Sequence, residues 1–87
     1  MSLDPKSGRP LYMQLADLIA AKIETGEYAP DRVIPTPGRL ADEYGIAVLT
    51  GRRAMRELRE RGLIYTVPGK GSYVTPASEG HTSLPEG

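Results

Sequence analysis

The sequence contains no cysteine, tryptophan or phenylalanine, and its single histidine is His81. The absence of cysteine excludes disulfides, thiolate zinc sites and thiol catalysis. No apolar run approaches the roughly 18 residues that a membrane-spanning helix needs. No basic segment followed by an apolar stretch marks a secretory signal. We therefore expect a cytoplasmic protein without a membrane partner.

Patterns that carry catalysis are also missing. The sequence shows no pair of acids, nucleophile with a base, or metal-ligand cluster at a catalytic spacing. The one glycine-rich segment with a lysine, Gly69 to Ser72, lies between two predicted strands, whereas a phosphate-binding loop precedes a helix. The sequence thus predicts no enzyme, no cofactor and no metal.

Net charge is absent as well, since 11 basic residues balance 11 acidic ones. The charge is nevertheless unevenly distributed. Residues 46–75 hold six basic and two acidic residues, a net charge of +4, whereas residues 1–45 carry a net charge of −2 and residues 76–87 another −2. A positive potential on one segment of a small domain is typical of nucleic-acid binding.

Three helices are predicted from apolar spacing and from the residues that begin and end helices. The first follows Pro10 and ends at Gly26. The second begins after a hydroxyl cap at Thr36 and ends at Gly45. The third covers about 47–61, with Gly51, Ala54, Met55 and Leu58 facing inward. The last two helices, joined by a glycine turn, have the geometry of a helix-turn-helix.

Two β-rich segments, 63–67 and 72–75, flank turn residues and predict a hairpin with a basic tip. A short strand at Arg32–Ile34 is a further possibility between the first two helices. The predicted fold class is therefore α+β, a winged helix-turn-helix domain over residues 1–75. Residues 76–87 have too little apolar surface to order a core and are predicted to be a disordered tail or a linker to an absent effector domain.

In this order, the motifs from Pro10 to Val74 resemble the N-terminal domain of the GntR family of bacterial transcription regulators. No single motif is specific, but the ordered set is. Its main elements are Pro10-Leu11-Tyr12, Gly26-Glu27, Ile34-Pro35-Thr36, Leu40-Ala41, Tyr44-Gly45, Arg52-Arg53-Ala54-Met55-Arg56-Glu57-Leu58, Gly62-Leu63-Ile64 and Gly69-Lys70-Gly71-Ser72-Tyr73-Val74.

The resemblance implies sequence-specific binding of double-stranded DNA by a transcription regulator, expected to be a repressor. It implies a homodimer on a palindromic operator, with the third helix in the major groove and the wing near the minor groove. The residues that we predict to contact DNA are Thr36, Arg39, Leu49, Thr50, Arg52, Arg53, Arg56, Gly69, Lys70 and Gly71.

The chain departs from the family pattern at the start of the third helix. Where the family commonly has Ser-Arg-Thr-Thr-Val, residues 47–51 are Ala-Val-Leu-Thr-Gly, and Gly38 stands where the second helix commonly carries an arginine. Loss of the serine cap costs about 1 kcal/mol, and glycine within a helix costs roughly 0.5–1 kcal/mol relative to alanine.

Several of these residues allow a purely structural interpretation. The arginines of the third helix could form a solvated face with pairs Arg53/Glu57 and Arg56/Glu60. Leu49 either contacts a thymine methyl group or folds inward with Val48 to fill space left by Gly51.

Two residues outside that helix are open in the same way. Lys70 could be a solubilising turn residue, and Thr36 is first of all a helix cap. The departures at Val48, Leu49 and Gly51 leave a second function open, a protein-interaction or dimerisation module on the same scaffold.

Overall fold

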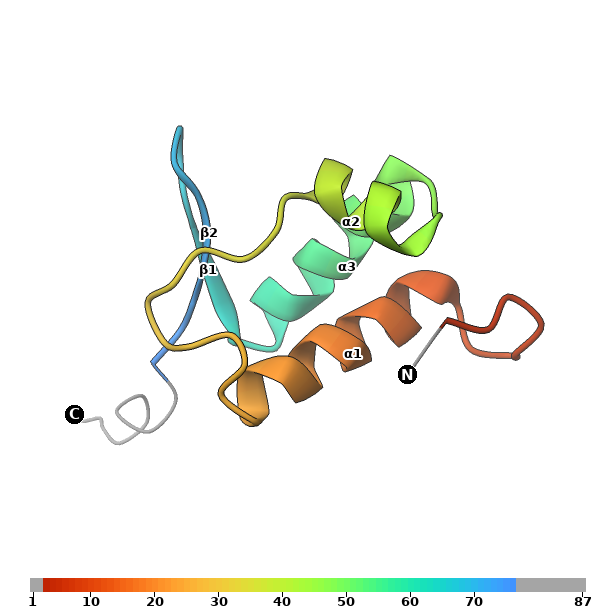
Figure 1. The fold of residues 1–87 in the computed structure, drawn as a ribbon, viewed down its shortest axis with the longest axis horizontal. Coiled ribbons are helices and arrows are strands. Elements are labelled where there is room, and N and C mark those ends of the chain that lie inside the picture. Colours follow the sequence, from red (N-terminus) through yellow and green to blue (C-terminus); the bar gives the residue numbers. More distant parts are fainter. Residues whose placement is uncertain (1–2, 77–87) are drawn as a thin grey trace.

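A computed structural model describes residues 3–76, which fold into three helices followed by a two-stranded antiparallel hairpin (Figure 1). This order confirms the predicted α+β winged helix. The predicted tail covers residues 76–87, and residues 77–87 lie outside the part of the chain that the structure describes. None of the helices described is long and apolar enough to cross a membrane. The elements are α1 (Leu11–Glu24), α2 (Pro37–Tyr44), α3 (Val48–Glu60), β1 (Ile64–Val67) and β2 (Gly71–Val74).

Helix α3 is the central element, because it packs against α1, α2 and β1. Figure 1 shows α1 running beside α3 and the hairpin standing at the far end of α3. The predicted inward set on α3 is confirmed, since all four of its residues are buried. They pack against the buried face of α1, which is formed by Leu15, Ala16, Leu18 and Ile19. The fully buried large side chains are Leu15, Ile19, Leu40, Leu58 and Val74.

The two helices of the helix-turn-helix begin differently. At the start of α2 the Thr36 hydroxyl accepts a hydrogen bond from the Arg39 amide at 3.2 Å, as a capping threonine should. At the start of α3, Ala47 has the extended backbone of a cap residue but offers no side-chain acceptor. The turn between them depends on Gly45, whose φ of +65° lies in the left-handed region that glycine adopts without strain.

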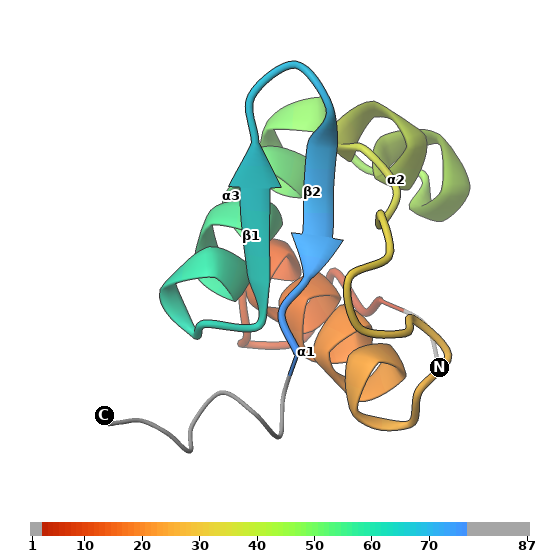
Figure 2. The same cartoon turned by 90° about the vertical axis from the view of Figure 1, so that its left-hand side faces the viewer.

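The hairpin turns one face toward the core and one toward solvent. Ile64 pairs with Val74, and both are buried. The next pair along the strands, Tyr65 and Tyr73, points to the opposite face, where the two rings stack with centroids 5.7 Å apart. In Figure 2 the broad face of the hairpin lies in front of α3, and the turn of the hairpin projects beyond the helices.

The short strand considered at Arg32–Ile34 is reduced to a single bridge between Val33 and Tyr73. Hydrogen bonds on either side of it join Ile34 N to Ser72 O at 2.9 Å and Val74 N to Arg32 O at 3.0 Å. The pairing cannot extend toward α2, because the next residue is Pro35, which has no amide hydrogen to donate. The segment therefore anchors the loop before α2 to the hairpin.

Candidate nucleic-acid interface

The exposed side of α3 carries a groove of roughly 400 Å³ lined by five side chains, which we call the arginine groove: Leu49, Arg52, Arg53, Arg56 and Arg59. Their spacing of three, four and seven residues places them on one helical face, opposite the buried stripe. All four arginines are exposed. The sequence predicted this face, although Arg59 was not among its predicted DNA contacts.

Three of these arginines form no ion pair within residues 3–76: Arg52, Arg53 and Arg56. The alternative pairs Arg53/Glu57 and Arg56/Glu60 are therefore wrong. Glu57 instead pairs with Arg61, whose guanidinium lies 2.9 Å from its carboxylate. The three cations are thus free to donate to an external anion without first breaking a contact.

Leu49 and Val48 both point outward, with exposed fractions of 58% and 45%. The inward alternative for Leu49 is therefore wrong, and so is its premise that Gly51 leaves space to fill. A Cβ atom built on Gly51 would lie 2.9 Å from the Pro37 carbonyl oxygen and 3.3 Å from the Pro37 Cα. Glycine at this position lets the first residue of α2 rest directly on α3.

Arg59 joins α3 to the hairpin. Its Nη1 donates to the Thr66 hydroxyl at 3.3 Å, and that hydroxyl lies 3.0 Å from the Ser72 hydroxyl on the paired strand. The arginine groove therefore ends at the wing. Helical spacing alone places Arg59 on the same flank of α3 as Arg52 and Arg56. It does not predict the contact of Arg59 with Thr66 on a strand.

A chain of ion pairs holds the far end of α3 to α1. Asp17 accepts from Arg9 at 2.8 Å and from Arg61 at 3.0 Å, and Arg61 also contacts Glu57. Desolvation alone would raise the pKa of Asp17, but the hydrogen bonds and charges of the two arginines outweigh it and lower the pKa. The hydrogen bond that Arg61 donates to Glu57, helped by the one it donates to Asp17, outweighs desolvation and raises the pKa of Arg61. Arg9 and Arg61 thus join elements of the fold, and neither lines the arginine groove.

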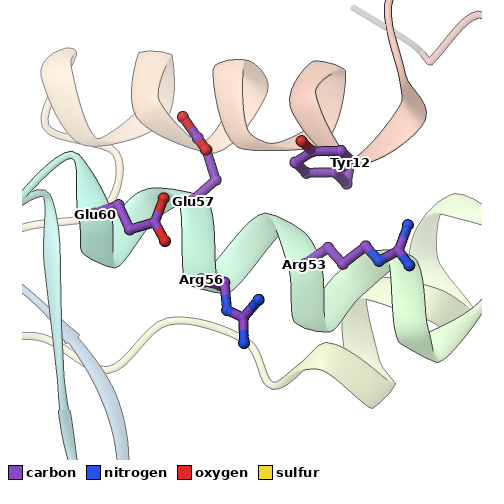
Figure 3. Close-up of a pocket in the computed structure, with 5 residues that line it drawn as sticks. All are labelled: Tyr12, Arg53, Arg56, Glu57 and Glu60. Carbon is purple, nitrogen blue, oxygen red and sulfur yellow. The ribbon is translucent and has the colours of Figure 1, made fainter.

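On the other flank, α1 and α3 border a second hollow of roughly 370 Å³ (Figure 3). Figure 3 shows Tyr12 projecting from α1 toward α3, and Arg53 and Arg56 extending from α3. Glu57 and Glu60 line the same hollow. Carboxylates on this side repel an anion, so they mark the boundary of the positive surface.

The wing exposes Lys70 at its tip, as predicted. Gly69 has a φ of +78°, and the Lys70 amide donates to the Val67 carbonyl at 3.0 Å to close the turn. Gly71 is only half-exposed, because it lies against Val33, whose Cγ2 would be 3.2 Å from a Cβ built at this glycine.

The remaining predicted contacts lie at the starts of the two helices. Thr36 and Arg39 are exposed at the start of α2, and Thr50 is half-buried in the first turn of α3. The Thr36 hydroxyl is already used as a cap, so its structural interpretation is confirmed. The structure brings four of the predicted α3 contacts together in one groove, Leu49, Arg52, Arg53 and Arg56, whereas Thr50 does not line it. Gly69 lies in the turn of the wing and Gly71 at the start of β2.

The sequence profile of the bacterial regulatory proteins of the gntR family matches residues 11–74. The chain belongs to the GntR family. This GntR-family chain is 32% identical over 91 residues to the HTH-type transcriptional repressor NagR of Bacillus subtilis, which covers 99% of the chain and 37% of NagR. It is 39% identical over 66 residues to the mannosyl-D-glycerate transport/metabolism system repressor MngR of Escherichia coli, covering 76% of the chain and 28% of MngR. The GntR-family chain thus spans about a third of the length of these relatives.

Solved structures of GntR type share the fold. The structure of AraR(DBD) in complex with operator ORR3 is 33% identical, with a TM-score of 0.75 over 86% of this chain and 90% of that one. YtrA from Sulfolobus acidocaldarius, a GntR-family transcription factor, is 32% identical, with a TM-score of 0.79 over 86% of this chain and 79% of that one. The GntR-family chain therefore has the winged-helix fold of these proteins.

Proposed function

We propose that this chain binds double-stranded DNA in a sequence-specific manner, as the DNA-binding domain of a bacterial transcription regulator that acts as a repressor. The observation that carries the proposal is the arginine groove, in which three exposed arginines have no partner within the described residues. A helix with such a face fits the major groove, where arginine contacts phosphates and guanine edges. The role is one of binding rather than catalysis, in the cytoplasm.

Similar proteins support this proposal. AraR(DBD) has been solved with operator DNA, and NagR and MngR are named as repressors. With α3 in the major groove, the wing projects toward the neighbouring minor groove, where a small, cationic tip can approach the backbone. Because one such domain covers only half of a two-fold site, we propose a homodimer on a palindromic operator.

The proposed contacts divide by chemistry. Arg52, Arg53 and Arg56 bind phosphates or base edges, while Thr50 lies in the first turn of the same helix. At the start of α2, Arg39 and the amides beside Thr36 face the DNA backbone. In the wing, Lys70 supplies the charge and Gly69 and Gly71 the close approach.

Titration with duplex DNA at 50 mM and 200 mM salt tests the proposal. Binding that uses 6–10 phosphate contacts weakens by about 10³–10⁵ over this range, because bound phosphates release their counterions. Sedimentation of the complex on a selected palindrome should give two chains per duplex. Weak, salt-independent binding, together with tight binding to a protein partner, would replace this proposal with the interaction-module hypothesis.

A further inference from the structure

Leu49 is the one apolar side chain among those that line the arginine groove. It is 58% exposed and lies outside the core. Arg52 and Arg53 stand one helical turn beyond it and Arg56 two turns beyond it, on the same face. Leu49 therefore lies at the amino-terminal end of the face that the proposed function assigns to DNA.

The surrounding charge restricts what can cover this leucine. An apolar protein surface placed on Leu49 would also have to desolvate the guanidinium groups that line the groove, without an anion to compensate them. A duplex satisfies both demands, because its phosphates meet the arginines while its groove floor meets the leucine. The charge complementarity of the groove thus favours DNA as the occupant of Leu49.

In the major groove, the apolar group that a base edge offers is the C5 methyl of thymine. We propose that Leu49 contacts a thymine C5 methyl and thereby sets the base preference of this chain at one position of each half-site. The inference rests on the proposed function, since it requires α3 to enter the major groove. 5-Methylcytosine carries the same group, and the test below separates the two sources.

The probe is a duplex selected by the purified chain from an unmethylated random-sequence library. Each thymine of the selected site is then replaced in turn by deoxyuridine, which removes the methyl group and leaves base pairing unchanged. Burial of one methylene-sized group is worth about 0.8 kcal/mol, so loss of the contacted methyl should weaken binding about fourfold. The effect should appear at one position of each half-site.

Two variants assign the effect to its side chain. Leu49→Ala should bind the thymine and deoxyuridine duplexes equally. Val48→Ala is the matched control, because Val48 is also exposed in the first turn of α3 but does not line the groove. This control should keep the fourfold difference. Thermal melting should show all three chains equally folded, since both residues are exposed.

The outcomes separate the inference from the function on which it rests. If deoxyuridine changes nothing at any position while the selected duplex still binds far more tightly than a scrambled one, Leu49 does not contact a methyl group and the proposed function stands. Discrimination that survives in Leu49→Ala would also overturn the inference. A site selected only after methylation of the library's cytosines would overturn the assignment to thymine. Failure to select any duplex would overturn the proposed function as well.

Discussion

The two halves of α3 use the same residue type in opposite ways. In the first half and the middle, Arg52, Arg53 and Arg56 make no ion pair within the part of the chain described. At the end, Arg59 bonds to Thr66 of the wing, and Arg61, which caps the helix, pairs with Asp17 and Glu57. Sequence alone shows arginines at regular spacing, whereas their partners divide them into binding and structural groups.

This division has a physical cause. Carboxylates that can neutralise the helix lie at its far end, at Glu57, Glu60 and across from it on α1 at Asp17. An arginine that pairs with one of these carboxylates is compensated in the free protein and gains little from a phosphate. Arg53 and Arg56 line a hollow with Glu57 and Glu60 but pair with neither, so they can still form the full charge-assisted hydrogen bond to a phosphate. The comparison therefore predicts which substitutions affect binding and which affect folding.

The largest expected effect is on affinity. Replacing Arg52, Arg53 and Arg56 together by glutamine should weaken duplex binding at least about 100-fold, since each arginine on a base edge is worth roughly 1–3 kcal/mol. If they contact phosphates instead, the slope of log affinity against log salt should fall by about 2.7. Fluorescence anisotropy with a labelled selected duplex measures both quantities.

Arg61→Gln is the matched control for that experiment. It should leave affinity within about twofold and lower the free energy of unfolding by about 1 kcal/mol at most, because its ion pairs are partly exposed. An affinity loss as large for Arg61→Gln as for the triple variant would show that the two halves of α3 are not functionally distinct.

A smaller effect concerns stability at the start of α3. Gly51→Ala should lower the free energy of unfolding by about 1 kcal/mol, because overpacking costs roughly 1–3 kcal/mol and alanine regains only part of this in helix propensity. Gly38→Ala is the control, since its Cβ would meet only the Thr36 hydroxyl at 3.9 Å. That variant should be as stable as the parent or up to about 1 kcal/mol more stable. Equal melting temperatures for the two variants would contradict the close contact between α2 and α3.

The smallest effect concerns pH and the far end of α3. The pKa of Asp17 is lowered in the folded chain, so its ion pairs stabilise the fold above the pKa of an unfolded aspartate, about 3.9, and this contribution is lost as the pH falls through the lower folded value. Asp17→Asn should therefore cost about 1 kcal/mol at most at pH 7, and less below about pH 4. Urea unfolding across this range measures the difference. In an Arg9→Gln/Arg61→Gln background, Asp17→Asn should have no such effect.

Local chemistry made much of this fold predictable. Thr36, Gly45 and the apolar spacing of α1 and α3 act within one turn or one helix, so the sequence alone indicates where these elements begin, end and face. The contact between Gly51 and Pro37 and the bond from Arg59 to Thr66 each join different elements. They depend on how helices pack in space, which residue spacing does not specify.

The same distinction explains the candidate site. The arginine face of α3 could be predicted, because it follows from helical periodicity and charge. The direction of the Leu49 side chain could not be predicted, because it depends on the space next to Gly51, which the packing of α2 defines. Likewise, the extent of the Arg32–Ile34 strand depends on its pairing with a hairpin about forty residues away.

The exposure of Leu49 also affects how this domain can evolve. A side chain that is 58% exposed and outside the core can be exchanged at a cost usually within about 0.5 kcal/mol of stability. Selection can therefore vary position 49 almost freely while the scaffold stays intact, so a gene duplicate could acquire a new target without passing through an unfolded intermediate. Position 51 is more restricted in this chain, because a Cβ atom there would lie 2.9 Å from the Pro37 carbonyl oxygen.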